Sequence, residues 1–314
     1  MATNQHKHQL ACASKRMSKN NTQGLNYPCF ALAKGWRLCL LVCLHLLCVS
    51  ATAGQGKLIA TAGLTEVEGS GGGGIVPWAT LSGYDSQDEI SISATATQVS
   101  LKDYRLNVLG VSASFYDRFE VSFAQQRFEL RGAGAEIKQD IIAIKYKLFG
   151  DVVYSSWPQV SIGAQYKSLD DASIARALGA SKSTGTDVYV AATKVHLGAV
   201  AGYNAVWNIA VRATKANEMG LLGHGNLNQP DKNKYQAQLE ASAGILLTQH
   251  LVIGAEYRQK PDNLGLGESN WTDYFVSYIP SKSFNFTVAW ADLGSIAGAP
   301  KQRGLYVSLN GQLF

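Results

Sequence analysis

Cysteine is missing from most of this 314-residue chain, because all five cysteines fall within residues 1–53. They are Cys12, Cys29, Cys39, Cys43 and Cys48. The rest of the chain therefore offers no disulfide framework, no thiol nucleophile and no cysteine ligand for zinc. This excludes small disulfide-stapled domains, cysteine-dependent enzymes and cysteine-ligated zinc proteins.

Acidic residues are missing from the same first 53 residues, which contain six of the 28 basic residues. The remainder of the chain carries nearly equal numbers of acidic and basic residues, so the excess positive charge belongs to the N-terminal segment. A nucleic-acid-binding domain would carry its own basic patch. We therefore expect no nucleic-acid partner.

Long hydrophobic runs are also missing. After residue 53 no stretch reaches 18 apolar residues, which argues against a transmembrane helix. The run Leu38–Val49 follows basic residues, precedes the small residues Ala51–Ala53, and is shorter than the roughly 20 residues that span a bilayer. This order predicts a cleaved secretory signal peptide over residues 1–53, with Met17 as an alternative start. A buried core helix is the other interpretation of the run.

The rest of the sequence alternates between apolar and polar residues with a period of two. Clear examples are residues 90–97, 119–123, 142–148, 160–167, 235–243 and 284–290. Successive side chains of a strand point to opposite faces, so each segment has one apolar and one polar face. The pattern predicts an all-β fold.

Short and long connections alternate between these segments. Tight turns are expected at Tyr116–Asp117, Thr248–Gln249 and Ser281–Lys282. Longer stretches rich in glycine and asparagine lie near residues 169–185, 217–233, 260–270 and 293–303. Short turns at one end and long loops at the other are typical of outer-membrane barrels. We therefore expect residues 54–314 to form a transmembrane antiparallel up-and-down β-barrel.

The barrel is predicted to have 14 strands, or 12. The 14 strands would begin near residues 57, 75, 88, 103, 118, 136, 158, 186, 204, 235, 250, 271, 283 and 304. Gly71–Gly74 and Pro77 disturb the first two, and proline removes a donor from the strand ladder. Twelve strands remain if those two are excluded. A periplasmic β-sandwich, in which the apolar faces pack together, is the alternative fold.

Aromatic residues lie near the predicted strand ends. They are Tyr104, Tyr166, Trp207, Tyr257, Trp271, Tyr274 and Trp290. Aromatic girdles at the two membrane interfaces are typical of such barrels, and ordinary sheet-core aromatics are the alternative. The last strand, Gly304–Phe314, ends on an aromatic residue and resembles a barrel assembly signal. We therefore expect outer-membrane lipid and the barrel assembly machinery as partners.

Three segments resemble those of an uncharacterised proteobacterial family of exported, barrel-like proteins, known only as a domain of unknown function. The segments are residues 56–69, 71–78 and 212–223. The resemblance covers nearly all of the chain after the signal peptide. It implies the location and the fold, and it assigns no activity to any residue.

No catalytic or metal-binding motif stands out. The stretch Gly69–Gly74 lacks the Lys-Ser/Thr that completes a phosphate-binding loop. His196, His224 and His250 occur in none of the usual metal-ligand spacings. We expect no catalytic residue, no metal and no cofactor, and we keep an outer-membrane hydrolase as a lesser alternative.

The polar faces carry the candidate functional residues. Those expected to line the lumen are Arg105, Arg118, Glu120, Lys145, Lys147, Lys167, Lys194, His196, Arg212, Glu240, Glu256 and Arg258. Basic residues outnumber acidic ones in this set, and rings of charge tune ion selection. The pattern predicts a passive pore for small polar solutes with mild anion preference. The alternatives are a structural or surface-interaction barrel, and a barrel whose inward charges pair and block flow.

One loop could set the width of such a pore. Residues 170–179 read as a short helix that would carry Asp171 and Arg176 into the lumen. A plain surface loop is the alternative. The oligomeric state stays open.

Overall fold

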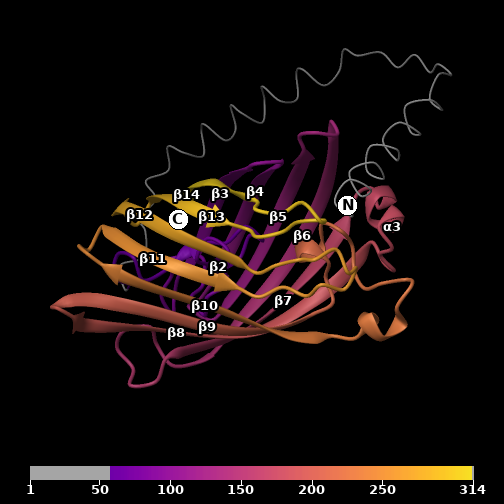
Figure 1. Cartoon of the computed structure of the whole chain (residues 1–314). Coiled ribbons are helices and arrows are strands. Elements are labelled where there is room, and N and C mark those ends of the chain that lie inside the picture. The colour runs from indigo at the N-terminus through magenta and orange to yellow at the C-terminus, as the bar shows by residue number, and fades with distance from the viewer. Residues whose placement is uncertain (1–56, 313–314) are drawn as a thin grey trace, which may run out of the picture.

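The computed structural model describes residues 57–312, so the predicted signal peptide lies outside the described residues. Twelve of the strands in this range form one closed antiparallel barrel (Figure 1). Two short strands, β1 (Leu64–Thr65) and β2 (Gly71–Gly72), pair only with each other. The all-β barrel is confirmed with the smaller of the two predicted strand counts, because residues near 57 and 75 do not join the wall.

The wall follows chain order, and the last strand pairs with the first. Its strands are β3 (Ile90–Leu101), β4 (Tyr104–Phe115), β5 (Phe119–Leu130), β6 (Ala135–Phe149), β7 (Gln159–Leu169), β8 (Thr184–Val200), β9 (Tyr203–Thr214), β10 (Gln236–Leu246), β11 (Leu251–Arg258), β12 (Trp271–Ser281), β13 (Phe284–Asp292) and β14 (Arg303–Gln312). The seam between β14 and β3 places Tyr306 opposite Val99. A closed sheet leaves no unpaired edge, which a single layer of strands needs if it is to stand in lipid.

The two ends of the barrel differ in the length of the connections between their strands. Tight turns join β4 to β5, β8 to β9, β10 to β11 and β12 to β13 at what we call the turn end. The four longest connections, after β7, β9, β11 and β13, meet at the opposite, loop end, and they hold α3 (Ser173–Ala177), η1 (Glu218–Gly220) and η2 (Pro230–Asn233). The short turns after β3 and β5 also lie at the loop end, and the connection between β6 and β7 lies at the turn end. None of the helices within residues 57–312 is long and apolar enough to cross a membrane.

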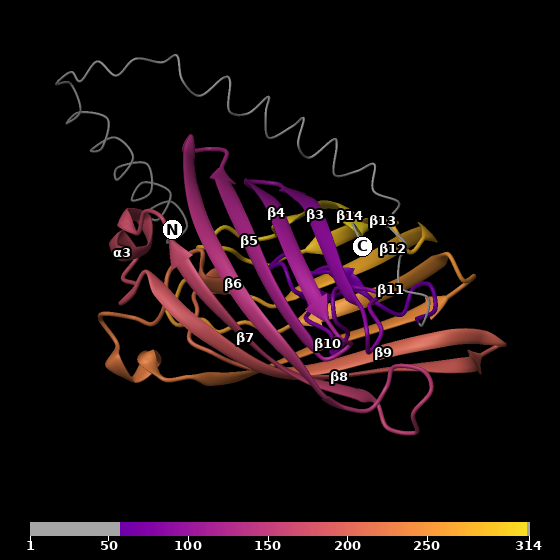
Figure 2. The ribbon, with the colours of Figure 1, turned by 180° about the vertical axis from the view of Figure 1, so that it is seen from behind.

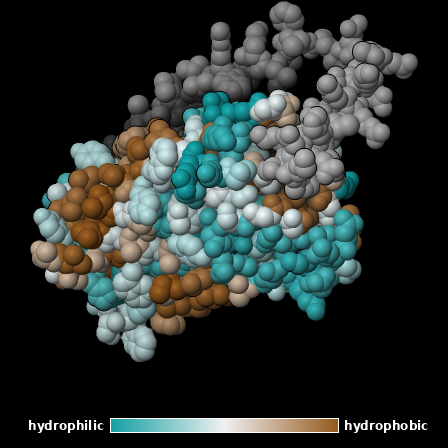
Figure 3. Space-filling model, in the orientation of Figure 1, coloured by the Kyte–Doolittle hydropathy of each residue, from teal (hydrophilic) through white to brown (hydrophobic). Residues whose placement is uncertain are grey.

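The outer face of the strands is apolar along the middle of the barrel. Exposed residues there are Leu109, Val111, Ile142, Ile144, Ile162, Val188, Val190, Ile209, Val211, Leu239 and Val276. Outward aromatic residues flank them, with Tyr166, Tyr235, Tyr257, Tyr274 and Trp290 toward the loop end and Tyr146, Tyr203, Trp207 and Tyr278 toward the turn end. Figure 3 shows hydrophobic residues over the strands and hydrophilic residues over the loops at the right of the view.

Two of the aromatic residues predicted for the girdle lie inside the barrel instead. Tyr104 and Trp271 are only 5% and 3% exposed. Tyr104 stacks on Phe128, with ring centroids 4.9 Å apart. Near the loop end the inner face of the wall is apolar and the outer face carries polar residues, which is the reverse of the arrangement in the rest of the barrel.

The N-terminal segment, residues 57–86, lies inside the barrel, and we call it the plug (Figure 2, indigo). It enters at the turn end, where Lys57 pairs with Asp117 at 2.7 Å. It turns back at Glu66, whose N–H donates to the Ser70 carbonyl at 2.9 Å, and then returns to β3. Its run of four glycines and its proline cannot alternate two faces of side chains, which explains why the plug forms no wall strand.

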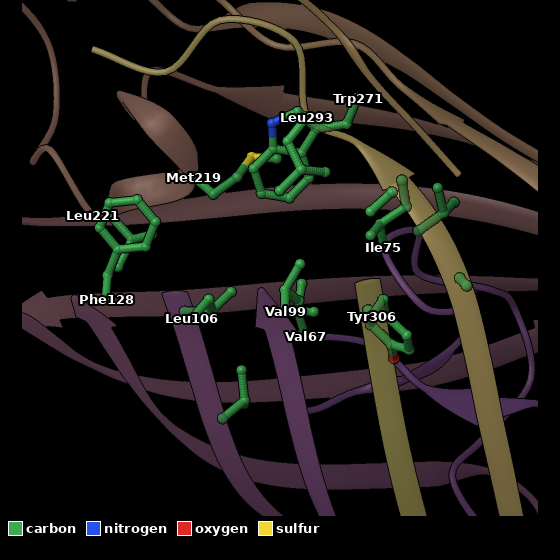
Figure 4. Packing of buried hydrophobic residues seen from close by; sticks show 14 of the residues in the cluster. Val67, Ile75, Val99, Leu106, Phe128, Met219, Leu221, Trp271, Leu293 and Tyr306 are labelled. Atoms are coloured by element: carbon green, nitrogen blue, oxygen red, sulfur yellow. The ribbon is translucent and has the colours of Figure 1, made fainter. Parts of the chain in front are cut away.

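A second segment closes the lumen at the loop end. Residues 216–224, here called the inner loop, belong to the connection between β9 and β10 and are buried. Figure 4 shows Met219 and Leu221 over the inner face of the wall, close to Phe128, Trp271 and Leu293. Both Glu218 and Met219 have positive φ, of 44° and 59°. Packing into this apolar layer therefore holds the backbone in a strained conformation.

Candidate functional site: the plug and the barrel wall

Wall side chains hold the backbone of the plug. Glu120 accepts hydrogen bonds from the N–H groups of Gly71 and Ser82, at 3.0 and 2.7 Å. Lys145 donates to the carbonyl groups of Gly71 and Thr80. Lys145 and Glu120 also lie 3.7 Å apart, so each wall charge has both a counter-charge and a plug partner. Such pairing is required, because an isolated charge inside a barrel would be strongly destabilising.

Glu256 makes the second such contact. It accepts hydrogen bonds from the N–H groups of Gly74 and Ile75, and from Ser242 at 2.7 Å. The Cβ of any residue at Gly73 would lie 1.7 Å from the Glu256 carboxylate. The plug therefore needs glycine at this position so that its backbone can approach the wall.

Uncharged wall residues hold Pro77 and Ala79 of the plug. Thr193 accepts a hydrogen bond from the Ala79 N–H at 2.8 Å, and Gln159 and Ser161 donate to the Ala79 carbonyl at 2.7 and 2.6 Å. Asn208 donates to the Pro77 carbonyl at 3.2 Å. These bonds satisfy a backbone that has no strand partner in the wall.

A layer of charged residues surrounds the tip of the plug. Its members are Glu66 and Glu68 of the plug and Lys167, Asp187, Arg212, Glu240 and Arg258 of the wall, all at most 1% exposed. Glu68 bonds to Lys167, to Arg258 at 2.6 Å and to Arg212 at 3.2 Å. One plug carboxylate thus contacts three wall cations.

The two plug carboxyls differ in their protonation. Burial and the neighbouring Glu68 raise the pKa of Glu66 to about 8, and the arginines offset this only in part. Burial also disfavours the charged form of Glu68, but the adjacent Arg212 and Arg258 outweigh it and hold its pKa far below the usual range. At neutral pH the tip of the plug therefore carries about one negative charge.

Eight of the twelve predicted lumen residues are buried inside the barrel. They are Glu120, Lys145, Lys147, Lys167, Arg212, Glu240, Glu256 and Arg258. They do not face an open channel, because plug or wall atoms already contact them. Lys147, for example, pairs with Asp117 in the tight turn after β4.

The other four predicted lumen residues do not face the interior of the barrel. Lys194 lies opposite the outward Trp207 and is covered by the connection between β6 and β7, where it donates to the carbonyls of Asp151, Val153 and Ser155. Arg105 alternates with the buried Tyr104 and Leu106, and its side chain is 41% exposed beside Glu129. Arg118 is exposed in the tight turn after β4, and His196 is exposed and accepts a hydrogen bond from Trp207. Arg105 was assigned to the wrong face because the interior of the barrel changes from polar to apolar toward the loop end.

The predicted constriction residues also lie elsewhere. Asp171 and Arg176 are exposed at the loop end, beside α3 and within it. The segment that enters the lumen is the inner loop, whose Met219 carbonyl accepts a hydrogen bond from Gln139 at 3.4 Å. Gln139 also donates to Gln126, which in turn donates to the Val67 carbonyl at 2.7 Å. The two lumenal segments therefore share one pair of wall glutamines.

Sequence reasoning missed several residues of the site. Asp187 and Asp273 are buried wall acids that were not named, although both alternate with outward residues in their strands. The 14-strand prediction places the plug in the wall as two strands, whereas the 12-strand alternative excludes it, and neither considers the Glu66-x-Glu68 pair. The three segments that carry the family resemblance, residues 56–69, 71–78 and 212–223, supply much of the plug and of the inner loop.

His224 shows how tightly the loop end is packed. It is 1% exposed, and burial lowers its pKa to about 4, so the ring is neutral. Its carbonyl accepts hydrogen bonds from the backbone of Ser181 and Lys182, which ties the inner loop to the connection after β7. Across residues 57–312 no group of three or more His, Cys, Asp or Glu side chains is placed to hold a metal ion.

Comparison with solved structures finds barrels of low similarity. The KdgM porin in complex with disordered oligogalacturonate is 13% identical with a TM-score of 0.46, over 70% of this chain and 98% of the porin. The NanC porin is 9% identical with a TM-score of 0.43, over 70% and 97%. The Acinetobacter baumannii outer membrane protein Omp33 is 9% identical with a TM-score of 0.41, over 72% and 99%. At this similarity none of them assigns a function to the chain.

No curated protein matches the sequence. A family match, in contrast, covers residues 61–310 and so includes all but the first residues of the plug, all but the last residues of the wall, and the inner loop. The predicted membership in a family of unknown function is confirmed. The chain belongs to the family described as "Protein of unknown function (DUF3034)".

Proposed function

We propose that this protein is an outer-membrane channel that its own N-terminal plug holds closed. The closed sheet, the apolar outer face and the two groups of flanking aromatic residues support placement in a membrane. In this proposal the signal peptide directs export, the barrel assembly machinery inserts the chain, and lipid surrounds the strands. The turn end would then face the periplasm.

One observation carries the proposal of a gate. The plug is bonded to the wall through side chains, while the backbone–backbone hydrogen bonds described for residues 57–86 stay within the plug or join Ser86 to Glu89 just after it. A segment held in this way can leave without breaking the ladder of the barrel. The wall that it would uncover is polar, as a water-filled lumen requires.

The uncovered wall would be balanced in charge. Its inward buried cations are Lys145, Lys147, Lys167, Arg212 and Arg258, and its inward buried acids are Glu120, Asp187, Glu240, Glu256 and Asp273. The two sets cancel, so the proposed mild anion preference for small polar solutes rests on the local excess of Lys167, Arg212 and Arg258 over Asp187 and Glu240. The reversal potential under a salt gradient measures that preference.

A structural barrel without a conducting channel is the second candidate function. The apolar inner loop favours it, because Met219 and Leu221 close the loop end independently of the plug. In that case the long loops would be the working part of the protein. The two candidates differ in one measurable property, which is whether the lumen conducts once the plug is free to move.

A disulfide lock tests the gate. The Ser70 and Ser122 hydroxyl oxygens lie 3.5 Å apart, one on the plug and one on the wall. We expect Ser70→Cys/Ser122→Cys to be silent in planar bilayers when oxidised and to show conductance steps when reduced. The chain after residue 53 has no cysteine of its own to interfere. Silence in both states would contradict the channel and favour the structural barrel.

A second pair of serines provides the matched control. Ser93 and Ser112 lie opposite each other on β3 and β4, with hydroxyl oxygens 2.6 Å apart. A disulfide between Ser93→Cys and Ser112→Cys would join two wall strands without tethering the plug, and the hydrogen bond from Ser93 to the Ser82 carbonyl is lost in both redox states. Its conductance is expected to be the same in the oxidised and the reduced state.

A further inference from the structure

We infer that the wall cations around Glu68 form a binding site for the carboxylate of a solute, and that the plug occupies this site in the closed barrel. Glu68 would then act as a built-in competitor of the solute. The inference deepens the proposed channel function, because a solute reaches Lys167, Arg212 and Arg258 only when the plug has moved.

The site is built around a single carboxylate. One Glu68 oxygen bonds to Lys167, and the other bonds to Arg258 and Arg212, at 2.6 and 3.2 Å. Charge-assisted hydrogen bonds to both oxygens are the usual means of recognising a carboxylate. No part of this arrangement depends on the glutamate backbone, so any carboxylate of similar reach can replace it.

The wall holds the three cations in place without the plug. Glu240 accepts from Arg212 at 2.8 Å and lies 3.0 Å from the Nε of Arg258. Asp187 lies 2.6 Å from the Nζ of Lys167. The Tyr189 ring lies 5.3 Å from the Arg212 guanidinium, which adds a cation–π contact. Cations fixed in this way lose little freedom on binding an anion, which favours affinity.

Charge balance requires an anion at this position. The three wall cations face two wall acids, Asp187 and Glu240, so removal of the plug leaves one positive charge without a partner. An unpaired buried charge is strongly unfavourable. The balance is restored by one carboxylate, which points to a monocarboxylate as the preferred ligand.

The surroundings of the Glu66 carboxyl, beside Glu68, indicate which group of the ligand lies next to its carboxylate. Gln165 donates to one Glu66 oxygen at 2.7 Å, and the other oxygen lies 4.0 Å from both arginines with no hydrogen bond. A neutral hydroxyl group would suit this position better than a second charge. The site therefore fits a hydroxylated monocarboxylate, for which gluconate is a suitable probe and glucose its uncharged counterpart.

Competition between the probe and the plug can be measured in detergent on the chain from residue 54 onward, which has no cysteine of its own. A single Ser70→Cys substitution places a thiol on the buried plug, where maleimide reacts only after the plug moves. We expect gluconate to raise the labelling rate about tenfold, with saturation, and glucose to leave it unchanged. Equal effects of gluconate and glucose, or of gluconate and chloride, would overturn the assignment of a carboxylate site.

Substitutions of the wall cations test whether gluconate raises the labelling rate by binding at this site. Arg258→Gln should abolish the response to gluconate, and Lys167→Gln serves the same purpose if the first variant does not fold. Lys194→Gln is the matched control, because Lys194 bonds to the connection between β6 and β7 and not to the plug. A response that persists in both site variants contradicts the inference.

The labelling assay also separates this inference from the proposed channel. Labelling reports movement of the plug and needs no current. If bilayers stay silent while gluconate still speeds labelling, the channel proposal fails and the carboxylate site stands. If the reduced disulfide variant conducts while gluconate has no effect on labelling, the channel stands and the site fails.

Discussion

Glu256 of β11 accepts hydrogen bonds from two successive plug N–H groups, those of Gly74 and Ile75, at 2.7 Å each. Glu256 and these two plug residues are more than 180 positions apart in the sequence. The Glu256 carboxylate thus accepts two backbone hydrogen bonds that carbonyl groups of a helix or a neighbouring strand would otherwise accept. The wall therefore fixes the plug at a defined depth, and the neighbouring Gly73 must be small for the contact to form.

Gly73→Ala tests this close approach. The added Cβ would lie 1.7 Å from the Glu256 carboxylate, so the plug would have to shift and lose its hydrogen bonds. Overpacking of this kind costs about 1–3 kcal/mol. We expect faster maleimide labelling at Ser70→Cys and more frequent channel opening. Gly132→Ala is the control, since nothing lies within 4 Å of a Cβ at that position; equal behaviour of the two variants would rule out the close approach.

The protonation of Glu66 predicts a dependence on pH. Burial and Glu68 raise its pKa to about 8 in the plugged barrel, against 4.5 when the group is free. The seated plug is therefore favoured fully below about pH 4.5, and that stabilisation is lost as the pH rises toward 8. Arg212, Arg258 and Glu240 face the same group.

Channel opening should accordingly increase from pH 5 to pH 8.5. The time that single channels spend open in planar bilayers measures this. Glu66→Gln replaces the titrating group by a neutral one that resembles its protonated form, so it should flatten the curve at the low level of opening seen at pH 5. A curve of unchanged slope in Glu66→Gln would assign the dependence to another group.

The strands of the wall could be predicted from the sequence, because outward and inward residues alternate along each of them. Outward residues such as Ile142 and Ile144 alternate with buried ones, and the predicted starts of all twelve wall strands fall within two residues of the observed ones. The positions of the plug and the inner loop in the lumen could not be predicted from the sequence. The contacts of Glu68 with Lys167 and Arg258 join residues about 100 and 190 positions apart, and no local pattern encodes them.

The outer face of the strands should tolerate charge poorly. Ile209 lies in the middle of β9 and is 50% exposed on the apolar side. Ile209→Arg would place a charge near the centre of the bilayer, at a cost of roughly 2–4 kcal/mol. The free energy of unfolding in lipid vesicles, from a urea titration, measures the loss.

Leu227→Arg provides the comparison for the outer face. Leu227 is 60% exposed in the long connection between β9 and β10, outside the strands. Its substitution should leave the free energy of unfolding nearly unchanged. If both variants lose the same stability, or neither does, the apolar outer face does not contact lipid.

The inner loop should limit the current once the plug is free. Its apolar side chains fill the loop end of the lumen, whereas α3 lies outside it. Replacing residues 217–223 by two glycines in reduced Ser70→Cys/Ser122→Cys is expected to raise the single-channel conductance several-fold, because the narrowest part of the path is removed. Deleting residues 171–179 in the same background should leave the conductance unchanged. The reverse result would restore the α3 segment as the constriction and make the inner loop a structural packing element.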